Sequence, residues 1–66
     1  MLLIVVRDGG TTVISDNQIE GWKRLYPYVN VKKEISSLDE RGILRKYTAK
    51  GILKVINRHL EMKNKK

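Results

Sequence analysis

The turn sequence Asp8-Gly9-Gly10 lies between two β-branched, apolar runs, and this arrangement constrains the fold more than any other feature of the chain. Residues 2–6 have the sequence LLIVV and residues 11–15 have TTVIS, and both compositions are typical of strands. Asp and Gly tolerate positive φ, so they favour a tight turn between the strands. A two-stranded hairpin is only marginally stable alone in water. The sequence therefore predicts an N-terminal β-hairpin whose one face packs against the rest of the chain.

A first helix is expected between the hairpin and Pro27, the single proline of the chain. Ser15 or Asp16 can cap its N-terminus, because both have a side-chain oxygen that accepts from backbone N–H groups. Proline disfavours the helical conformation of the preceding residue, so the helix ends before Pro27. Its apolar side chains recur at helical spacing, at Ile19, Trp22, Leu25 and Tyr26.

Two further helices are predicted from polar caps followed by apolar side chains at helical spacing. Asn30 can cap the earlier of them, which Gly42 weakens or ends, and Thr48 can cap the later one. The earlier helix has an apolar face formed by Val31, Ile35 and Leu38. The later helix has an apolar stripe formed by Ile52, Val55, Ile56 and Leu60. The expected fold class is α+β, an N-terminal β-hairpin packed on a three-helix bundle in the order ββααα.

A chain of 66 residues forms one domain at most and has little stability to spare. We expect residues 1–62 to form this domain and residues 63–66 to be a flexible basic tail. The absence of cysteine excludes disulfides and thiolate metal sites and suits a reducing compartment. The opening MLLIVV lacks the basic flank of a signal peptide, and no stretch approaches the roughly 20 apolar residues of a membrane span. The expected location is the cytoplasm.

The positive charge of the chain is concentrated in its C-terminal part. The net charge is +7, and residues 41–66 carry nine basic side chains against Glu61 alone, whereas residues 1–40 have a net charge of −1. Such asymmetry indicates a polyanionic partner, most often nucleic acid. Membrane headgroups and an acidic protein are the other partners that this charge allows.

The last predicted helix has a basic outer face. Lys50, Lys54 and Arg58 recur every four residues opposite the apolar stripe, although like charges at this spacing repel one another. Lys and Arg can contact phosphates, and Asn and Arg can reach base edges in a major groove. The alternative is a solvated face that keeps a small protein soluble. The candidate nucleic-acid-binding residues are Arg41, Arg45, Lys46, Lys50, Lys54, Asn57 and Arg58.

The remaining side chains offer little chemistry. His59 is the single histidine and is expected at the boundary of the apolar stripe, where its ring packs. Trp22 and Tyr26 are expected in the core, whereas Tyr28 and Tyr47 are freer, and Tyr47 is the better candidate for stacking on a base. The sequence contains no recognisable nucleophile–base pair or metal-ligand set. We therefore expect a protein that is not an enzyme and has no cofactor and no metal.

Two motifs carry a resemblance to a known family. They are DGG…V…W-K-x-L-Y-P-x-V-N-V-x-x-E-I and Y-T-A-K-G-I-x-x-x-I-N-x-x-L. This pattern resembles a small module of phage replication proteins, found at the C-terminus of replisome-organiser-type proteins and in short phage or prophage proteins. The segment ERGILRK is shorter than its counterpart in that family, and His59 replaces a Trp. The matching residues are Asp8, Gly9, Trp22, Tyr26, Pro27, Val29, Asn30, Val31, Glu34, Ile35, Thr48, Gly51, Ile52, Ile56, Asn57 and Leu60.

The resemblance implies a phage or prophage origin and a role in replication. The leading hypothesis is a small DNA-binding protein that contacts DNA through the basic face of its last helix. One small domain has a small footprint on DNA and would bind weakly as a monomer, so dimerisation is expected if the affinity is to be biologically useful. The alternative is a protein-interaction module that docks a replication or host factor through the edge of the LLIVV strand. Binding to a membrane surface is the weakest hypothesis, because the apolar stripe is needed for the core.

Overall fold

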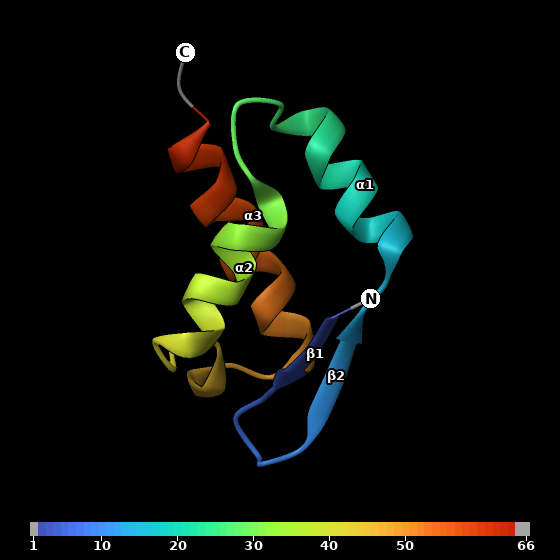
Figure 1. The fold of residues 1–66 in the computed structure, drawn as a ribbon. Coiled ribbons are helices and arrows are strands. Elements are labelled where there is room, and N and C mark those ends of the chain that lie inside the picture. The colour runs from blue at the N-terminus through green and yellow to red at the C-terminus, as the bar shows by residue number, and fades with distance from the viewer. Residues whose placement is uncertain (1, 65–66) are drawn as a thin grey trace.

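The computed structural model describes residues 2–64 and contains a two-stranded antiparallel hairpin followed by three α-helices. Figure 1 shows the hairpin at one end of the molecule, with α1 beside α2 and with α3 behind α2. The expected α+β fold class and the order ββααα are therefore confirmed. The elements are β1 (Leu2–Val5), β2 (Thr11–Ile14), α1 (Asp16–Leu25), α2 (Val31–Glu40), the short 3-10 helix η1 (Leu44–Lys46) and α3 (Ala49–Lys63).

The hairpin turn has the geometry that its Asp-Gly-Gly sequence favours. Gly9 has a positive φ of 85°, which glycine adopts without steric cost. Its N–H donates to the carbonyl of Val6 at 3.0 Å, and the N–H of Val6 donates to the carbonyl of Gly10 at 2.9 Å. Asp8 stabilises the turn through Oδ1, which accepts from the N–H of Gly10 at 3.0 Å. These bonds fix the register in which Leu3 lies opposite Val13.

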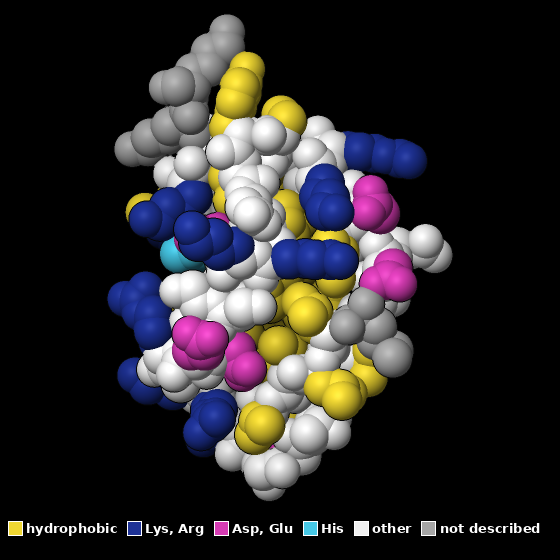
Figure 2. Space-filling view, in the orientation of Figure 1, with side chains coloured by type: hydrophobic (Ala, Val, Ile, Leu, Met, Phe, Trp, Pro, Cys, Tyr) yellow, Lys and Arg dark blue, Asp and Glu magenta, His cyan; other side chains and the backbone are white. Residues whose placement is uncertain are grey.

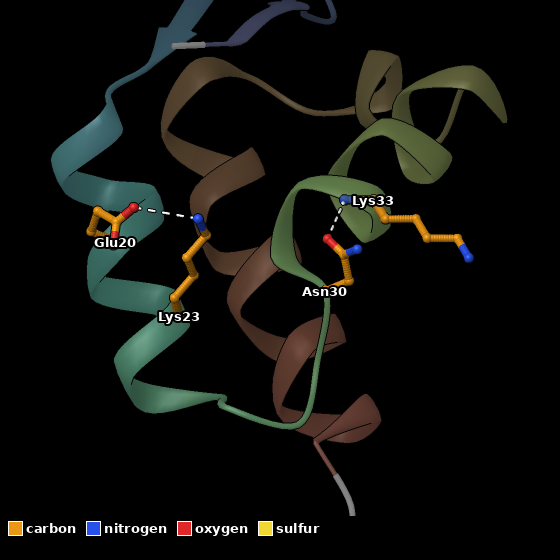
Figure 3. Close-up of polar contacts among 4 residues, drawn as sticks. All are labelled: Glu20, Lys23, Asn30 and Lys33. Carbon is orange, nitrogen blue, oxygen red and sulfur yellow. Dashed lines mark hydrogen bonds and ion pairs between the residues drawn. The ribbon is translucent and has the colours of Figure 1, made fainter.

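Each of the α-helices α1, α2 and α3 begins at a side-chain cap that the sequence predicts. Ser15 rather than Asp16 caps α1 and accepts from the N–H of Gln18. Asn30 caps α2 through Oδ1, which accepts from the N–H of Lys33 at 3.2 Å (Figure 3). Thr48 caps α3 in the same way. Such caps satisfy backbone donors that have no partner inside the helix.

The end of α2 at Glu40 is fixed by Gly42, which has a φ of 74°. The N–H of Gly42 donates to the carbonyl of Asp39 at 3.0 Å, and the N–H of Ile43 donates to the carbonyl of Leu38 at 3.1 Å. This pair of bonds is a Schellman motif, which reverses the chain after a helix. It directs the chain into η1 and then towards α3.

The core is formed by hydrophobic side chains from both strands, α1, α2, α3 and the segments between them. Leu44 of η1 has no exposed surface, and the sequence prediction missed it because one Leu in a basic loop has no apolar periodicity. Leu25, which was predicted on the apolar stripe of α1, is 64% exposed, because α1 packs along Ile19 and Trp22 and ends at Leu25. The buried residues are Ile4, Val6, Ile14, Ile19, Trp22, Val31, Ile35, Leu38, Leu44, Ile52, Ile56 and Leu60.

The C-terminal end of α3 extends into the segment predicted to be a tail. Lys63 is the last residue of α3. Asn64 follows it, and its Oδ1 accepts from the backbone N–H of Tyr28 at 3.0 Å. Residues 65–66 of the predicted tail lie outside the described part of the chain. Within the described part, no helix is both long and apolar enough to cross a membrane.

Replacement of Leu44 by Ala should lower the free energy of unfolding by about 2–5 kcal/mol, because it leaves a cavity in the core. Leu25→Ala is the matched control and should change this free energy by no more than about 0.5 kcal/mol. Urea unfolding followed by circular dichroism measures both values. Equal effects of the two substitutions would contradict the role of η1 as an anchor in the core.

Candidate nucleic-acid interface

The side chains of α3 divide between a buried face and an outward face. Ile52, Ile56 and Leu60 have no exposed surface, and their spacing of four residues places them on one side of the helix. Lys50, Lys54 and Arg58 are exposed, and the same spacing places them in a row on the opposite side. We call these three residues the basic stripe. Eight residues of α-helix separate its ends, a distance of about 12 Å.

The charges of the basic stripe have no acidic partner within the described chain. No carboxylate of residues 2–64 lies within 4.0 Å of Lys50, Lys54 or Arg58. The surface elsewhere is mixed, since Figure 2 shows Asp and Glu side chains among the Lys and Arg side chains over α1 and α2. Lys23, for example, lies 3.3 Å from Glu20 on α1 (Figure 3). The stripe is therefore a single-sign surface, which attracts polyanions more strongly than a mixed one.

The segment before α3 adds basic side chains to the N-terminal end of the stripe. Arg45 and Lys46 belong to η1 and are exposed, and two residues later α3 begins. Arg41 is exposed at the C-cap of α2. The N-terminus of a helix also presents unpaired N–H groups and the positive end of the helix dipole. These features add positive charge at the beginning of α3.

The hairpin turn lies beside this end of α3, which the sequence alone did not indicate. The backbone N–H of Arg7 donates to the carbonyl of Tyr47 at 2.8 Å. This bond joins residues 40 positions apart in the sequence and brings the backbone of Arg7, an exposed residue, next to the segment that contains Lys46. Tyr47 is 39% exposed, so its ring is open to solvent as predicted. No local pattern could have identified Arg7, because its position depends on a tertiary hydrogen bond.

Asn57 has a different environment from the other candidate residues. It is half-buried, and its Oδ1 accepts a hydrogen bond from the Tyr26 hydroxyl at 2.9 Å. This bond joins the end of α1 to the middle of α3. The side chain predicted to reach base edges therefore already uses its oxygen within the fold. The same hydrogen bond gives the Tyr26 hydroxyl a partner at the margin of the core.

His59 lies at the boundary of the core, as its spacing predicts. Its Nε2 lies 2.8 Å from Oε1 of Glu34, and this pair links α3 to α2. The groups are about three-quarters shielded, with 22% and 25% of their side-chain surface exposed. Across residues 2–64, no cluster of three or more His, Asp or Glu side chains is arranged to hold a metal ion.

No family model matches this chain, and neither a curated protein nor a solved structure is significantly similar to it. The resemblance to a phage replication module therefore stays a hypothesis, and the case for function depends on the geometry of the surface.

The Tyr26–Asn57 bond predicts that Asn57 contributes to stability. Tyr26→Phe should lower the free energy of unfolding by about 0.5–1.5 kcal/mol, since it removes one part-buried hydrogen bond. A double-mutant cycle with Asn57→Ala should give a coupling energy of similar size. Tyr28→Phe is the control, because Tyr28 is exposed, and it should have no effect. A coupling energy near zero would show that the two side chains act independently.

Proposed function

We propose that this protein is a non-enzymatic DNA-binding protein of phage or prophage origin with a role in replication, and that α3 is its DNA-contacting element. The observation that carries the DNA-binding part of this proposal is the basic stripe of three exposed cations, Lys50, Lys54 and Arg58, which have no acidic partner among residues 2–64. The phage and replication parts depend on the sequence resemblance alone.

The dimensions of α3 support binding to a duplex. An α-helix with its side chains is about 10–12 Å wide, and the major groove of B-DNA is about 12 Å wide. A row of cations along the outward face allows contacts to phosphates along the groove walls. Single-strand binders instead stack successive bases on aromatic platforms, and only Tyr47 offers an exposed ring beside the candidate basic residues.

The hairpin turn and η1 would contact the backbone next to the groove. Arg7, Arg45 and Lys46 are exposed at the N-terminal end of α3, and the Arg7–Tyr47 backbone bond holds the turn there. A helix flanked by a fixed basic turn positions a protein on DNA through phosphates, while side chains of the helix contact base edges. Asn57 contributes to this proposal chiefly through its Nδ2 donor, since its Oδ1 already accepts from the Tyr26 hydroxyl.

Neutralisation of the basic stripe should weaken DNA binding and reduce its dependence on salt. Each phosphate contact releases condensed counterions, so Lys50→Gln, Lys54→Gln and Arg58→Gln together should reduce the slope of log affinity against log salt by about 2 to 3. Fluorescence anisotropy with a labelled duplex at several salt concentrations measures this slope.

The matched control for the stripe is a triple variant with the same change in net charge. Arg24→Gln, Lys32→Gln and Lys33→Gln alter exposed residues of α1 and α2 and should leave the slope nearly unchanged. Equal losses in the two triple variants would mean that DNA responds only to total charge, and the basic stripe would then not be the binding site.

A single substitution tests the contribution of the hairpin turn. Arg7→Gln keeps the backbone N–H that donates to Tyr47 and removes one charge, so it should reduce the salt slope by about 1 if Arg7 contacts a phosphate. Arg24→Gln removes one charge from the exposed end of α1 and is the control. An Arg7 variant with the affinity and slope of the unmodified protein would remove the hairpin from the interface.

A further inference from the structure

The side chain of Tyr47 packs against the first turn of α3 and still has an exposed surface. A Cβ atom placed on Gly51 would lie 3.5 Å from Cβ of Tyr47 and 3.8 Å from Cδ1 of its ring. The aromatic side chain therefore borders the space that Gly51 leaves open on the helix. Tyr47 is nevertheless 39% exposed. Its ring is held beside the helix while part of its surface faces solvent.

The glycine at position 51 is not required by the backbone. Among the described residues, positive φ angles occur at Gly9 and Gly42 and not at Gly51, and glycine is less favourable than alanine inside a helix. A methyl group at this position would occupy the space beside the Tyr47 ring. The glycine thus leaves more of the ring accessible to a ligand on the outward side of α3.

Gly51 lies on the same side of α3 as the basic stripe. Positions i, i+3 and i+7 of a helix share a face, and the residues three and seven positions after Gly51 are Lys54 and Arg58. The Cα–Cβ bonds of a helix tilt towards its N-terminus, so the side chains of the stripe lean towards the end at which Tyr47 lies. The aromatic ring therefore adjoins one end of the row of cations.

The backbone of Tyr47 is fixed on both sides. Its N–H donates to the carbonyl of Leu44 at 3.2 Å, and its carbonyl accepts from the N–H of Arg7 at 2.8 Å. Leu44 has no exposed surface, and Figure 1 shows the segment that leads from η1 into α3 passing beside β1. A side chain on a backbone that is already ordered loses less conformational freedom when it binds a ligand.

We propose that Tyr47 stacks on one unpaired base next to the duplex that α3 binds, so the preferred ligand is a DNA duplex with a single-stranded end. This inference rests on the proposed function, because the basic stripe holds the phosphates of the duplex part. Every base has a π face, so stacking on an aromatic side chain tolerates any sequence. A paired base is already stacked within the duplex and must be unstacked before a side chain can take it. The ring therefore selects a base without a pair.

Fluorescence anisotropy with three labelled duplexes of the same sequence tests this inference at one salt concentration. One duplex has blunt ends, one ends in a short thymidine overhang, and one ends in an overhang of abasic nucleotides of the same length. The two overhangs carry the same phosphates and differ only in their bases. The unmodified protein should bind the thymidine overhang at least about fivefold more tightly than the abasic overhang, since one base–aromatic stack is gained.

Substitutions of two tyrosines assign this preference to one ring. Tyr47→Ala should bring the ratio of the two affinities to about one, whereas Tyr47→Phe should keep the preference because the ring remains. Tyr28→Ala is the matched control, because Tyr28 is 59% exposed and lies near the other end of α3, where its N–H donates to Asn64. This control should keep the preference. Circular dichroism checks that each variant is folded.

A measurement on the unmodified protein covers the case in which Tyr47→Ala does not fold. The fluorescent base 2-aminopurine replaces the first unpaired base of the overhang, and stacking on the ring should quench its fluorescence when the protein binds. Equal affinity for the two overhangs, unchanged 2-aminopurine fluorescence, or a preference that Tyr28→Ala also removes overturns the inference, while binding to the blunt duplex still supports the proposed function. Absence of binding to all three duplexes overturns both.

Discussion

The backbone hydrogen bond from Arg7 to Tyr47 is the contact on which the arrangement of this small protein depends. At 2.8 Å, it joins the hairpin turn to the residue just before the cap of α3. Leu44, without exposed surface, anchors the same connection in the core from the other side. The hairpin, η1 and the start of α3 therefore lie together, and a hairpin that is marginal alone is held beside the helix that carries the basic stripe.

Two long-range polar contacts join α3 to the other two α-helices. The Tyr26–Asn57 bond at 2.9 Å joins α3 to α1, and the His59–Glu34 contact at 2.8 Å joins it to α2. Both contacts use side chains at the margins of the buried face. These half-buried polar groups of α3 thus have partners within the fold, while Lys50, Lys54 and Arg58 have no acidic partner in the described chain. The contacts that hold α3 in the fold and its row of exposed cations therefore lie on different sides of the helix.

The sequence predicted the features that depend on neighbouring residues and missed those that depend on tertiary contacts. Caps at Asn30 and Thr48 follow from side-chain chemistry within one turn, and the apolar spacing of α3 identified its buried face correctly. Leu44 was missed because burial of a single loop residue has no periodic signal. The hydrogen bond of Asn57 was missed for a similar reason, since its partner, Tyr26, lies 31 residues away. Helical spacing alone was enough to predict that the basic stripe faces outward. The position of Arg7 beside the start of α3 could be found only from the folded chain.

The basic stripe is unfavourable for the isolated protein, and this cost is an argument for a ligand. Each pair of like charges four residues apart destabilises a helix by about 0.2–0.5 kcal/mol, and Lys50, Lys54 and Arg58 form two such pairs on α3. The hydrophobic core of a domain of this size rarely supplies more than about 3–5 kcal/mol of stability. A polyanion bound to the folded state alone would remove the repulsion and add its own binding free energy to stability. If the proposed DNA binding holds, the same three side chains would link the stability of the fold to occupancy of α3, with the complex more stable than the free protein.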